Sequence, residues 1–370
     1  MSDSVLLITG IFPPDSGGPS KFAFEFGRWS SRNNIDLAVL TYSDKIESAE
    51  DVGDVKVSRI LRSNWLPTRY MKMICAIGNK ISPNVAVFAV GAFLETYAAS
   101  IIYRFKYVAK VPGDIVWERA RNNSFTELSI DDFQLKKLNL KYKMFRKLYS
   151  NSLKRASKVI VPSLGLYNLC LFWGVRKENI HIIYNSIDLV DYSKIQTSNP
   201  EYELVTVCRL VSWKGVAEVI EYAAKRNLKL AVVGDGPERE KLSSLADSLN
   251  AKVTFTGNIA PSMVNQILQK SRIFVLNSNY EGLPHALVEA RLAGLISVGR
   301  AGTGSEEVIN DDVDGYLVRE DRPLETTLDL AFSKSGSKND FVEKAKADSN
   351  SRFNREINYL ETSIVILGNI

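Results

Sequence analysis

The sequence predicts an α/β protein made of two doubly wound units, each with a largely parallel sheet. Short apolar runs typical of strands alternate with helical segments along the whole chain, which is the pattern of repeated βαβ units. The 370 residues are enough for two domains with ample cores. A polar stretch at 191–201 separates the two alternating regions, so we expect an interdomain linker there.

The expected strands fall into two groups, one on either side of that linker. In the first group they are Val5–Thr9, Asp36–Thr41, Val85–Val90, Lys106–Val111, Val159–Val161 and His181–Tyr184. In the second group they are Leu204–Cys208, Leu230–Val233, Val253–Thr256, Ile273–Leu276, Leu295–Val298 and Tyr316–Val318. We therefore expect a first unit at 1–190, a second unit at 202–337 and a C-terminal helical segment at 338–370.

Composition is that of an ordinary globular protein, with 45% hydrophobic and 24% charged residues. Cys75, Cys170 and Cys208 are scattered and odd in number, which argues against a disulfide framework and favours a reducing compartment. The first residues show no signal-peptide pattern, and no apolar run reaches the roughly 20 residues of a membrane span. We expect a cytoplasmic protein.

Positive charge is concentrated in the first half. Residues 1–190 carry 26 Lys and Arg against 17 Asp and Glu, whereas the remainder carries 21 against 25. Nucleic acid or an anionic membrane would each explain a basic half. The cations lack an accompanying nucleic-acid recognition motif, so nucleic acid is not the expected partner.

Two glutamates bracket the most informative segment, Glu281-Gly-Leu-Pro-His-Ala-Leu-Val-Glu289. It follows the apolar run Ile273–Leu276, and Pro284 suits the first turn of a helix. Free backbone N–H groups at a helix start bind anions, and carboxylates accept hydrogen bonds from hydroxyls. The turn could therefore hold a sugar phosphate. The alternative is that two glutamates at this spacing occur by chance, as they do in many helical proteins.

Two cations follow an earlier strand in the second half. Arg209 and Lys214 lie five residues apart in the loop after the strand that begins at Leu204. Loops at the carboxyl ends of strands are where open α/β sheets bind ligands. An Arg and a Lys there can neutralise a diphosphate leaving group without a metal. The alternative is a solvated loop with two surface cations.

Together these features resemble the second half of the retaining family-4 glycosyltransferases. The resemblance covers about 205–320 in order and is looser in the first half. It implies the GT-B architecture, in which two Rossmann-like domains face each other across a cleft, and in which a last helical stretch, here Phe341–Leu360, packs back on the first domain. The motifs that carry it are the Arg209 and Lys214 pair, Gly234-Asp-Gly-Pro237, Phe255-Thr-Gly257, the Glu281 to Glu289 element, Ala301–Val308 and Asp314–Val318.

The resemblance implies transfer of a sugar from a nucleoside-diphosphate sugar to a hydroxyl acceptor, with retention and without a metal or other cofactor. It implies that Arg209 and Lys214 stabilise the departing diphosphate. Glu281 and the backbone of Gly282 and Leu283 would orient the donor sugar and its phosphate.

Further donor contacts follow from the same resemblance. Glu289 would bind ribose hydroxyls, and the turn containing Gly234 and Gly236 would border the base. In the first half, Gly17 and Gly18 match the position of the family's glycine-rich first loop. They fit neither G-x-G-x-x-G nor the P-loop pattern.

Asp114 is the remaining catalytic candidate. It comes just after an expected strand, at the ligand edge of the sheet. Many family members carry a His or an Asp in the corresponding loop, near the reacting sugar. The alternative is that Asp114 only caps a turn.

The segment 133–158 carries nine basic residues and no acid. On a single helix, Leu140, Met144 and Leu148 would lie among the cations, a pattern typical of a helix resting on anionic lipid. We therefore expect Lys136–Lys158 to contact a membrane surface, with Trp65–Met73 as an accessory loop. The alternative is a solvated basic face whose apolar side chains are covered by another element. The stripe expected to face the core is Leu138, Tyr142, Phe145, Tyr149 and Ala156.

The spelling Asp312-Val-Asp314 resembles a metal-binding D-x-D motif, but turn chemistry explains it, and we predict no metal. The sequence thus predicts a cytoplasmic or peripheral membrane glycosyltransferase of polysaccharide or glycolipid assembly, acting on a saccharide or lipid-linked saccharide. Two alternatives stay open. One is a nucleotide-sugar epimerase of the same architecture, and the other is a non-catalytic scaffold that binds a nucleotide sugar.

Overall fold

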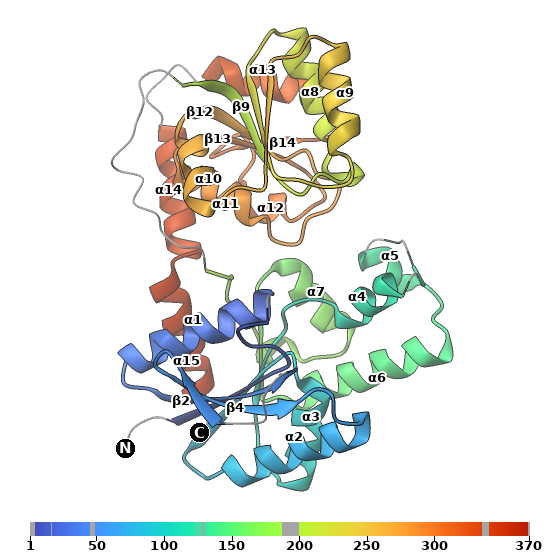
Figure 1. Ribbon diagram of the computed structural model, residues 1–370, viewed down its shortest axis with the longest axis vertical. Coiled ribbons are helices and arrows are strands. Elements are labelled where there is room, and N and C mark those ends of the chain that lie inside the picture. The colour runs from blue at the N-terminus through green and yellow to red at the C-terminus, as the bar shows by residue number, and fades with distance from the viewer. Residues whose placement is uncertain are drawn as a thin grey trace. The chain divides into compact units, whose positions relative to one another are not determined.

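The computed structural model describes residues 4–15, 17–44, 49–123, 125–126, 128, 130–186, 200–334 and 340–368 (Figure 1). The chain forms two compact units. Unit 1 comprises Met1–Tyr184 and Asn358–Ile370, and unit 2 comprises Asn185–Ile357. Each unit has its own sheet. Most of the expected linker, 191–201, lies outside the described residues.

The sheet of unit 1 has the strand order β3-β4-β2-β1-β5-β6-β7-β8 within the described residues. Every neighbouring pair is parallel except β3 and β4. Parallel neighbours need crossover connections, which are usually helices. The expected alternation of strands and helices in this half is therefore confirmed. The strands are β1 Ser4–Thr9, β2 Asp36–Ser43, β3 Ala49–Val52, β4 Val55–Leu61, β5 Val85–Val90, β6 Val108–Lys110, β7 Lys158–Val161 and β8 Ile180–Ile182.

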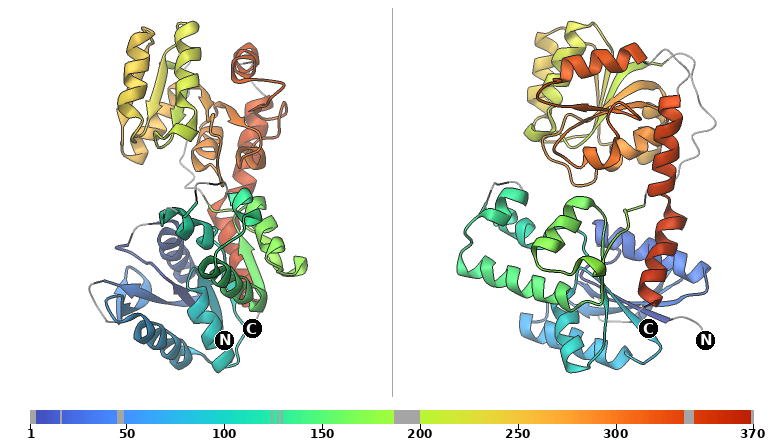
Figure 2. Two further views of the ribbon diagram at one scale, coloured as in Figure 1. Left: turned by 90° about the vertical axis from the view of Figure 1, so that its right-hand side faces the viewer. Right: turned by 180° about the vertical axis from the view of Figure 1, so that it is seen from behind.

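Helices cover both faces of this sheet. The helices α1 and α15 pack on one face, where Phe26 and Trp29 of α1 meet Tyr359 of α15 at ring-centroid distances of 5.4 and 5.9 Å. The helices α2, α3 and α6 lie side by side on the other face (Figures 1 and 2). The helices are α1 Gly18–Arg32, α2 Leu66–Lys80, α3 Phe93–Ile102, α4 Ile115–Asn122, α5 Ile130–Leu135, α6 Leu140–Arg155, α7 Leu164–Phe172 and α15 Arg355–Leu367.

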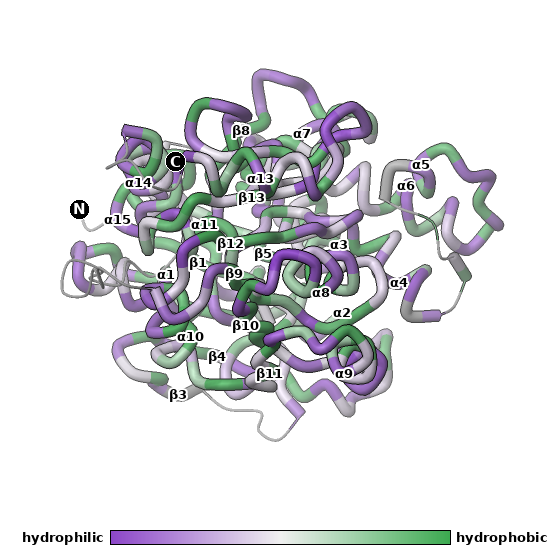
Figure 3. The backbone as a smooth tube through the Cα atoms, turned by 90° about the horizontal axis from the view of Figure 1, so that it is seen from above, coloured by the Kyte–Doolittle hydropathy of each residue, from purple (hydrophilic) through white to green (hydrophobic). Residues whose placement is uncertain are grey.

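Unit 2 contains a parallel sheet in the order β11-β10-β9-β12-β13-β14 within the described residues. Its strands are β9 Tyr202–Val207, β10 Leu230–Val233, β11 Val253–Gly257, β12 Ser271–Val275, β13 Ile296–Arg300 and β14 Tyr316–Val318. Its helices are α8 Val216–Lys225, α9 Arg239–Ser248, α10 Pro261–Gln269, α11 His285–Leu292, α12 Ser305–Val308, α13 Leu324–Lys334 and α14 Asp340–Arg352. Hydrophobic and hydrophilic residues are mixed along the elements of the chain, as the changing colour of the tube shows (Figure 3).

Two strands of unit 1 are missing from the sequence prediction. β3 and β4 form an antiparallel hairpin in which Val52 pairs with Val55. Gly53, with a φ of 64°, supplies the left-handed conformation that a tight hairpin turn needs. The acidic composition of β3 resembles that of a loop, and a weakly patterned edge strand takes its structure from its partner.

The expected accessory loop at Trp65–Met73 is wrong. Trp65 precedes the first residue of α2, and Pro67 lies in the first turn of that helix. Proline is compatible with a first helical turn because the N–H that it lacks has no intrahelical partner there.

The single helix expected across 133–158 is also wrong. α5 ends at Leu135, and α6 begins only at Leu140. Asn139 starts this second helix, since its side-chain Oδ1 accepts a hydrogen bond from Tyr142 N at 3.1 Å. At the other end, Lys158 already belongs to β7. Tyr142 and Tyr149 are buried as expected of the core-facing stripe.

The C-terminal helical segment consists of two helices. α14 packs against α11 in unit 2, where Asp348 pairs with Arg291 at 3.0 Å. From Asn358 onward, α15 belongs to unit 1, and its Tyr359 lies in the core of that unit. Among the helices of the described ranges, none is long and apolar enough to cross a membrane.

Candidate active site

Two of the predicted site residues meet at the edge of the unit 2 sheet. β9 and β12 are parallel neighbours, so the loops that follow them leave the same edge. Lys214 from the first loop forms an ion pair with Glu281 from the second. Their side chains are only 16% and 12% exposed. The structure therefore brings together a cation and a carboxylate that lie 67 positions apart in the sequence.

Cys208, the residue after β9, lies near enough to Lys214 and Glu281 for both charges to affect the pKa of its thiol. Burial raises the pKa of its thiol to about 11, the nearby Lys214 opposes that rise, and Glu281 adds to it. Such a thiol stays protonated at neutral pH and is a poor nucleophile. The ion pair, by contrast, supplies one positive and one negative group at the carboxyl end of the central strands.

A buried asparagine holds the Lys214 loop in place. The Nδ2 of Asn277 donates to Gly215 O at 3.2 Å, and its Oδ1 accepts from Arg300 Nη2 at 2.7 Å. Arg300 also contacts Glu218 Oε2 at 3.2 Å. Gly215 has a φ of 60°, and a Cβ on it would lie 2.4 Å from Asn277 O. Only glycine therefore fits directly after Lys214.

Sequence reasoning missed Asn277, Glu218 and Arg300. The available signal was polarity, because Asn277 and Ser278 follow an apolar strand at once and are fully buried. Buried polar side chains need partners, so they mark a place where loops are joined. The backbone N–H of Asn279 makes a further junction by donating to Trp213 O at 2.8 Å.

The turn before α11 is fixed by a second glycine-rich loop. Gly304 N donates to Glu281 O at 3.0 Å, and a Cβ on Gly304 would lie 1.6 Å from Gly282 O. Leu283 follows in this turn, Pro284 precedes the first helical residue, and Glu289 lies half-buried in the second turn of the helix. The backbone at Gly282 is thus held by its neighbours.

Arg209 borders a pocket of about 410 Å³ at the ends of β9, β10 and β11. Gly234 has a φ of 124°, and a Cβ there would lie 2.0 Å from Cys208 O. A Cβ on Gly236 would lie 2.2 Å from Leu210 O. These two glycines allow the turn after β10 to pack directly on the Arg209 loop and so form the pocket wall. Arg209 itself is exposed.

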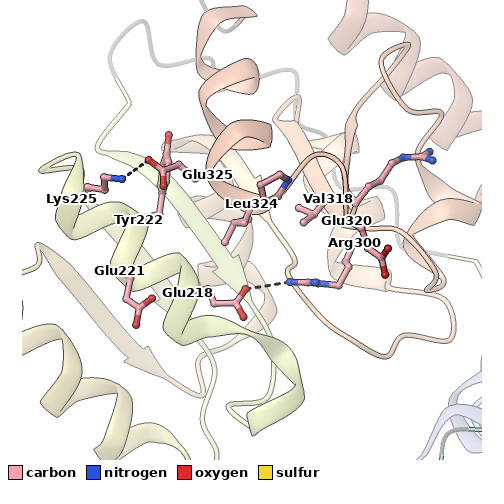
Figure 4. A pocket seen from close by; sticks show the side chains of 11 residues that line it. Glu218, Glu221, Tyr222, Lys225, Arg300, Val318, Glu320, Leu324 and Glu325 are labelled. Carbon is pink, nitrogen blue, oxygen red and sulfur yellow. Dashed lines mark hydrogen bonds and ion pairs between the residues drawn. The ribbon is translucent and has the colours of Figure 1, made fainter.

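A second hollow, of about 540 Å³, lies between α8 and α13 (Figure 4). None of the residues predicted for the site lines it. Four of its charged side chains pair with each other, Lys225 with Glu325 at 2.6 Å and Arg300 with Glu218 at 3.2 Å. This hollow therefore adjoins the network that holds Asn277 and does not contain the Lys214 and Glu281 pair.

In unit 1, Asp114 is buried and caps α4. Its Oδ1 accepts from Val116 N at 2.9 Å and from Trp117 N at 3.0 Å, and its Oδ2 accepts from Gln134 Nε2 at 2.8 Å. Burial raises the pKa of its carboxyl. The structure thus gives Asp114 the capping role that was the alternative to catalysis, and a catalytic role stays a prediction.

Gly17 and Gly18 stand at the start of α1, also in unit 1. Both are exposed, and Gly17 has a φ of 141°. The backbone there is open to a ligand, as the sequence predicts for a glycine-rich turn.

The D-x-D sequence has a structural role. Asp314 is buried, and its Oδ1 accepts from Arg291 Nη1 at 2.8 Å and from Asn310 N at 2.9 Å. Its Oδ2 accepts from Asn310 Nδ2 at 2.8 Å. Burial alone would raise the pKa of Asp314, but the hydrogen bonds from Arg291 and Asn310 hold it below its usual value. Asp312 pairs with Arg322 at 2.8 Å.

Comparison with known proteins finds similarity to glycosyltransferases. Residues 191–348 match the family model of Glycosyl transferases group 1. The chain is 28% identical over 291 residues to an uncharacterized glycosyltransferase of Methanocaldococcus jannaschii, covering 65% of this chain and 73% of that protein. It is 29% identical over 201 residues to the GalNAc-alpha-(1->4)-GalNAc-alpha-(1->3)-diNAcBac-PP-undecaprenol alpha-1,4-N-acetyl-D-galactosaminyltransferase of Campylobacter jejuni, covering 54% of this chain and 51% of that enzyme.

The fold is shared over nearly the whole chain. The crystal structure of Anabaena Alr3699/HepE in complex with UDP and glucose matches with a TM-score of 0.69 at 18% identity, covering 97% of this chain and 98% of that one. Residues 191–348 therefore resemble the glycosyl transferases group 1 family, and the chain as a whole has the GT-B fold of solved glycosyltransferases.

Proposed function

We propose that this protein transfers a sugar from a nucleoside-diphosphate sugar to a hydroxyl of a saccharide acceptor, with retention and without a metal. The observation that carries the proposal is the Lys214 and Glu281 ion pair beside the held backbone of Gly282. A cation that would bind a phosphate and a carboxylate that would bind a sugar hydroxyl thus lie at one sheet edge. The Anabaena structure contains UDP and glucose. The Lys214 and Glu281 pair would suit the same class of ligand, a nucleoside-diphosphate sugar.

The ion pair suggests how the donor is engaged. Lys214 and Glu281 form an ion pair with each other. A diphosphate that binds the Lys214 ammonium would draw it away from Glu281, and the carboxylate would then be free to accept a hydrogen bond from the donor sugar. Arg209, exposed at the neighbouring pocket, would bind the same diphosphate. Preorganised charges of this kind usually make the largest contribution to stabilising the transition state in which a phosphate group departs.

The chemical step then balances without a side-chain base. The bond between the anomeric carbon and the diphosphate oxygen breaks as the bond to the acceptor oxygen forms on the same face of the sugar. The acceptor proton moves to the departing phosphate. Arg209 and Lys214 stabilise the charge that develops on the diphosphate.

Product analysis tests the reaction class. With donor and acceptor present, proton NMR of the purified product should show an anomeric configuration equal to that of the donor. An epimerase would convert the donor with no acceptor present, and a scaffold would bind it without turnover. Inversion, or conversion of the donor alone, would refute the proposed reaction.

We further propose that unit 1 rests on an anionic membrane at the cytoplasmic side, which would suit a lipid-linked acceptor like that named for the Campylobacter relative. Leu140, Met144 and Leu148 of α6 are 83%, 56% and 37% exposed. In the described part of unit 1, then, no neighbouring element covers these side chains fully. Lys141 and Lys147, which flank them, are exposed as well.

Removing two of these lysines should weaken membrane binding. Each lysine near an anionic surface contributes roughly 1 kcal/mol, so Lys141→Gln with Lys147→Gln should lower the partition coefficient on phosphatidylserine vesicles by about 30-fold. The control pair, Lys241→Gln with Lys344→Gln, removes two exposed lysines of unit 2. Equal partitioning of the α6 variant and the control variant would exclude an electrostatic membrane contact through α6. Equal binding of the wild type to neutral and to anionic vesicles would exclude it as well.

A further inference from the structure

A cluster of polar and aromatic side chains lies in unit 1, apart from the residues discussed so far. Tyr42 is near the end of β2, Arg69 is in the first turn of α2, Glu95 is in the first turn of α3, and Arg119 is on α4. Tyr42 belongs to β2, and the helices α2, α3 and α4 follow β4, β5 and β6 of the same largely parallel sheet. The four residues, which we call the Arg69–Arg119 cluster, therefore gather at the carboxyl edge, where such sheets bind ligands.

The members of the cluster contact one another or their surrounding rings. Tyr42 Oη donates to Glu95 Oε1 at 2.9 Å. The guanidinium carbon of Arg69 lies 5.1 Å from the centroid of the Tyr42 ring. The guanidinium carbon of Arg119 lies 5.9 Å from the ring of Tyr149 on α6. Both arginines thus lie against aromatic rings.

Neither Arg69 nor Arg119 forms an ion pair with a carboxylate among the described residues. Burial raises the pKa of Glu95, and Arg69 and Arg119 are near enough to work against that rise. Yet among the described residues neither guanidinium is within 4 Å of a carboxylate oxygen. Arg69 Nη1 donates only to the carbonyl of Arg62, at 3.2 Å, and its buried Nε has no partner in the described part of the chain. A buried donor without a partner is unfavourable, so a ligand oxygen would be favoured at or beside it.

The available groups define a ligand class. Guanidinium groups bind phosphate and carboxylate through two parallel hydrogen bonds. Tyr70 is half-buried and lies close enough to Glu95, Arg69 and Arg119 for their charges to act on it. Its ring and hydroxyl suit a sugar, which has apolar faces and polar edges. The excess of positive charge favours an anion, and Arg119 is exposed, so a ligand can reach it.

We propose that the Arg69–Arg119 cluster binds the acceptor, and that the acceptor is a saccharide carrying a phosphate or carboxylate group. The inference rests on the proposed function, because an acceptor presupposes transfer. The position of the cluster is compatible with an acceptor held at a membrane, because the cluster lies against the buried side of the helix whose other side is proposed to contact lipid. Tyr149 lies on the buried side of α6, whereas Leu140 and Met144 of the same helix are exposed.

Saturation-transfer NMR on the full chain tests the ligand class, with glucose 1-phosphate, glucuronate, methyl glucoside and inorganic phosphate as probes. Either of the first two should bind more tightly than methyl glucoside, and glucose 1-phosphate more tightly than inorganic phosphate. Equal binding of methyl glucoside would overturn the anionic requirement. Equal binding of inorganic phosphate would overturn the saccharide requirement.

Variants locate the binding site. Arg69→Met with Arg119→Met should weaken glucose 1-phosphate binding by at least about tenfold. Arg209→Met in unit 2 should change it by less than about twofold. If Arg209→Met weakens binding and the double variant does not, the probe binds at the donor site and the proposal fails. Should the double variant not fold, Arg69→Lys keeps the charge and removes the fork, and is still expected to weaken binding.

The outcome is separable from that of the proposed function. A donor-induced rise in melting temperature reports on unit 2, whereas glucose 1-phosphate binding reports on the cluster. Loss of the second with retention of the first in the double variant would support the assignment. A wild-type protein that binds glucose 1-phosphate through Arg69 but no nucleoside-diphosphate sugar would retain the anion site and exclude the transferase.

Discussion

Replacing Lys214 by Met is expected to lower turnover of the sugar donor by about 10²–10³-fold, because removal of one preorganised group that stabilises developing charge has an effect of that size. Glu281→Gln is expected to lower turnover strongly as well, since an amide cannot balance the ammonium. The two changes should be far from additive, because the two groups contact each other. Donor turnover measured with matched enzyme concentrations gives all three values.

A control for this prediction is available in the same unit. Lys241 is exposed on α9 and pairs with Glu238 at 3.2 Å, so Lys241→Met removes a lysine from a similar kind of pair at the surface. Its turnover should equal that of the wild type. Circular dichroism and melting curves show whether the variants keep their fold. Near-normal turnover in both Lys214→Met and Glu281→Gln would refute the assignment of the site.

Replacing Arg291 by Met is expected to lower the free energy of unfolding by about 3–5 kcal/mol, the usual cost of removing one partner of a buried ion pair. Arg291 is fully buried and contacts Asp314 at 2.8 Å, Asp348 at 3.0 Å and Ser349 Oγ at 2.9 Å. Without it, the Asp314 carboxylate stays buried with Asn310 as its remaining side-chain partner. Urea denaturation, followed by fluorescence, measures the loss.

Arg226 provides a matched comparison. It also bridges two acids, Glu325 at 3.3 Å and Asp329 at 2.6 Å, but these groups are at the surface. Arg226→Met should therefore lower the free energy of unfolding far less than Arg291→Met does. A loss for Arg291→Met no greater than that of Arg226→Met would contradict the structural role given to the D-x-D sequence.

The Asp314 interaction also has a pH dependence of known sign. The pKa of Asp314 is lower in the folded protein than its ordinary value. Its contribution is therefore complete above the ordinary aspartate value of about 3.9 and is lost as the pH falls below it. The difference in stability between the wild type and Arg291→Met should narrow over that acidic range.

Much of the fold could be predicted from the sequence because buried parallel strands are uniformly apolar. Val85–Val90, Leu230–Val233 and Tyr316–Val318 match the observed strands exactly in their bounds. β3 and the gap between α5 and α6 could not be predicted in this way. β3 is an acidic edge strand that depends on β4, and a single capping residue, Asn139, decides where α6 begins.

Candidate site residues could be chosen from the sequence, but the contacts between them could not be predicted. Arg209, Lys214 and Glu281 stand out because they follow strands, and position after a strand is visible in a sequence. Their pairing is not visible, because it depends on β9 and β12 being neighbours although two strands separate them along the chain. Asn277 escaped notice for the same reason, since its importance comes from Gly215, which lies in another loop, and from Arg300, the last residue of β13.

The most direct measurement is a thermal-shift experiment with a panel of nucleoside-diphosphate sugars, because a ligand that binds only the folded state raises the melting temperature. At least one donor should stabilise the wild type and Lys241→Met by several degrees, and the same donor should stabilise Lys214→Met far less. If no nucleoside-diphosphate sugar stabilises the wild type, or if Lys214→Met responds as the wild type does, the edge formed by β9 and β12 is not a donor site.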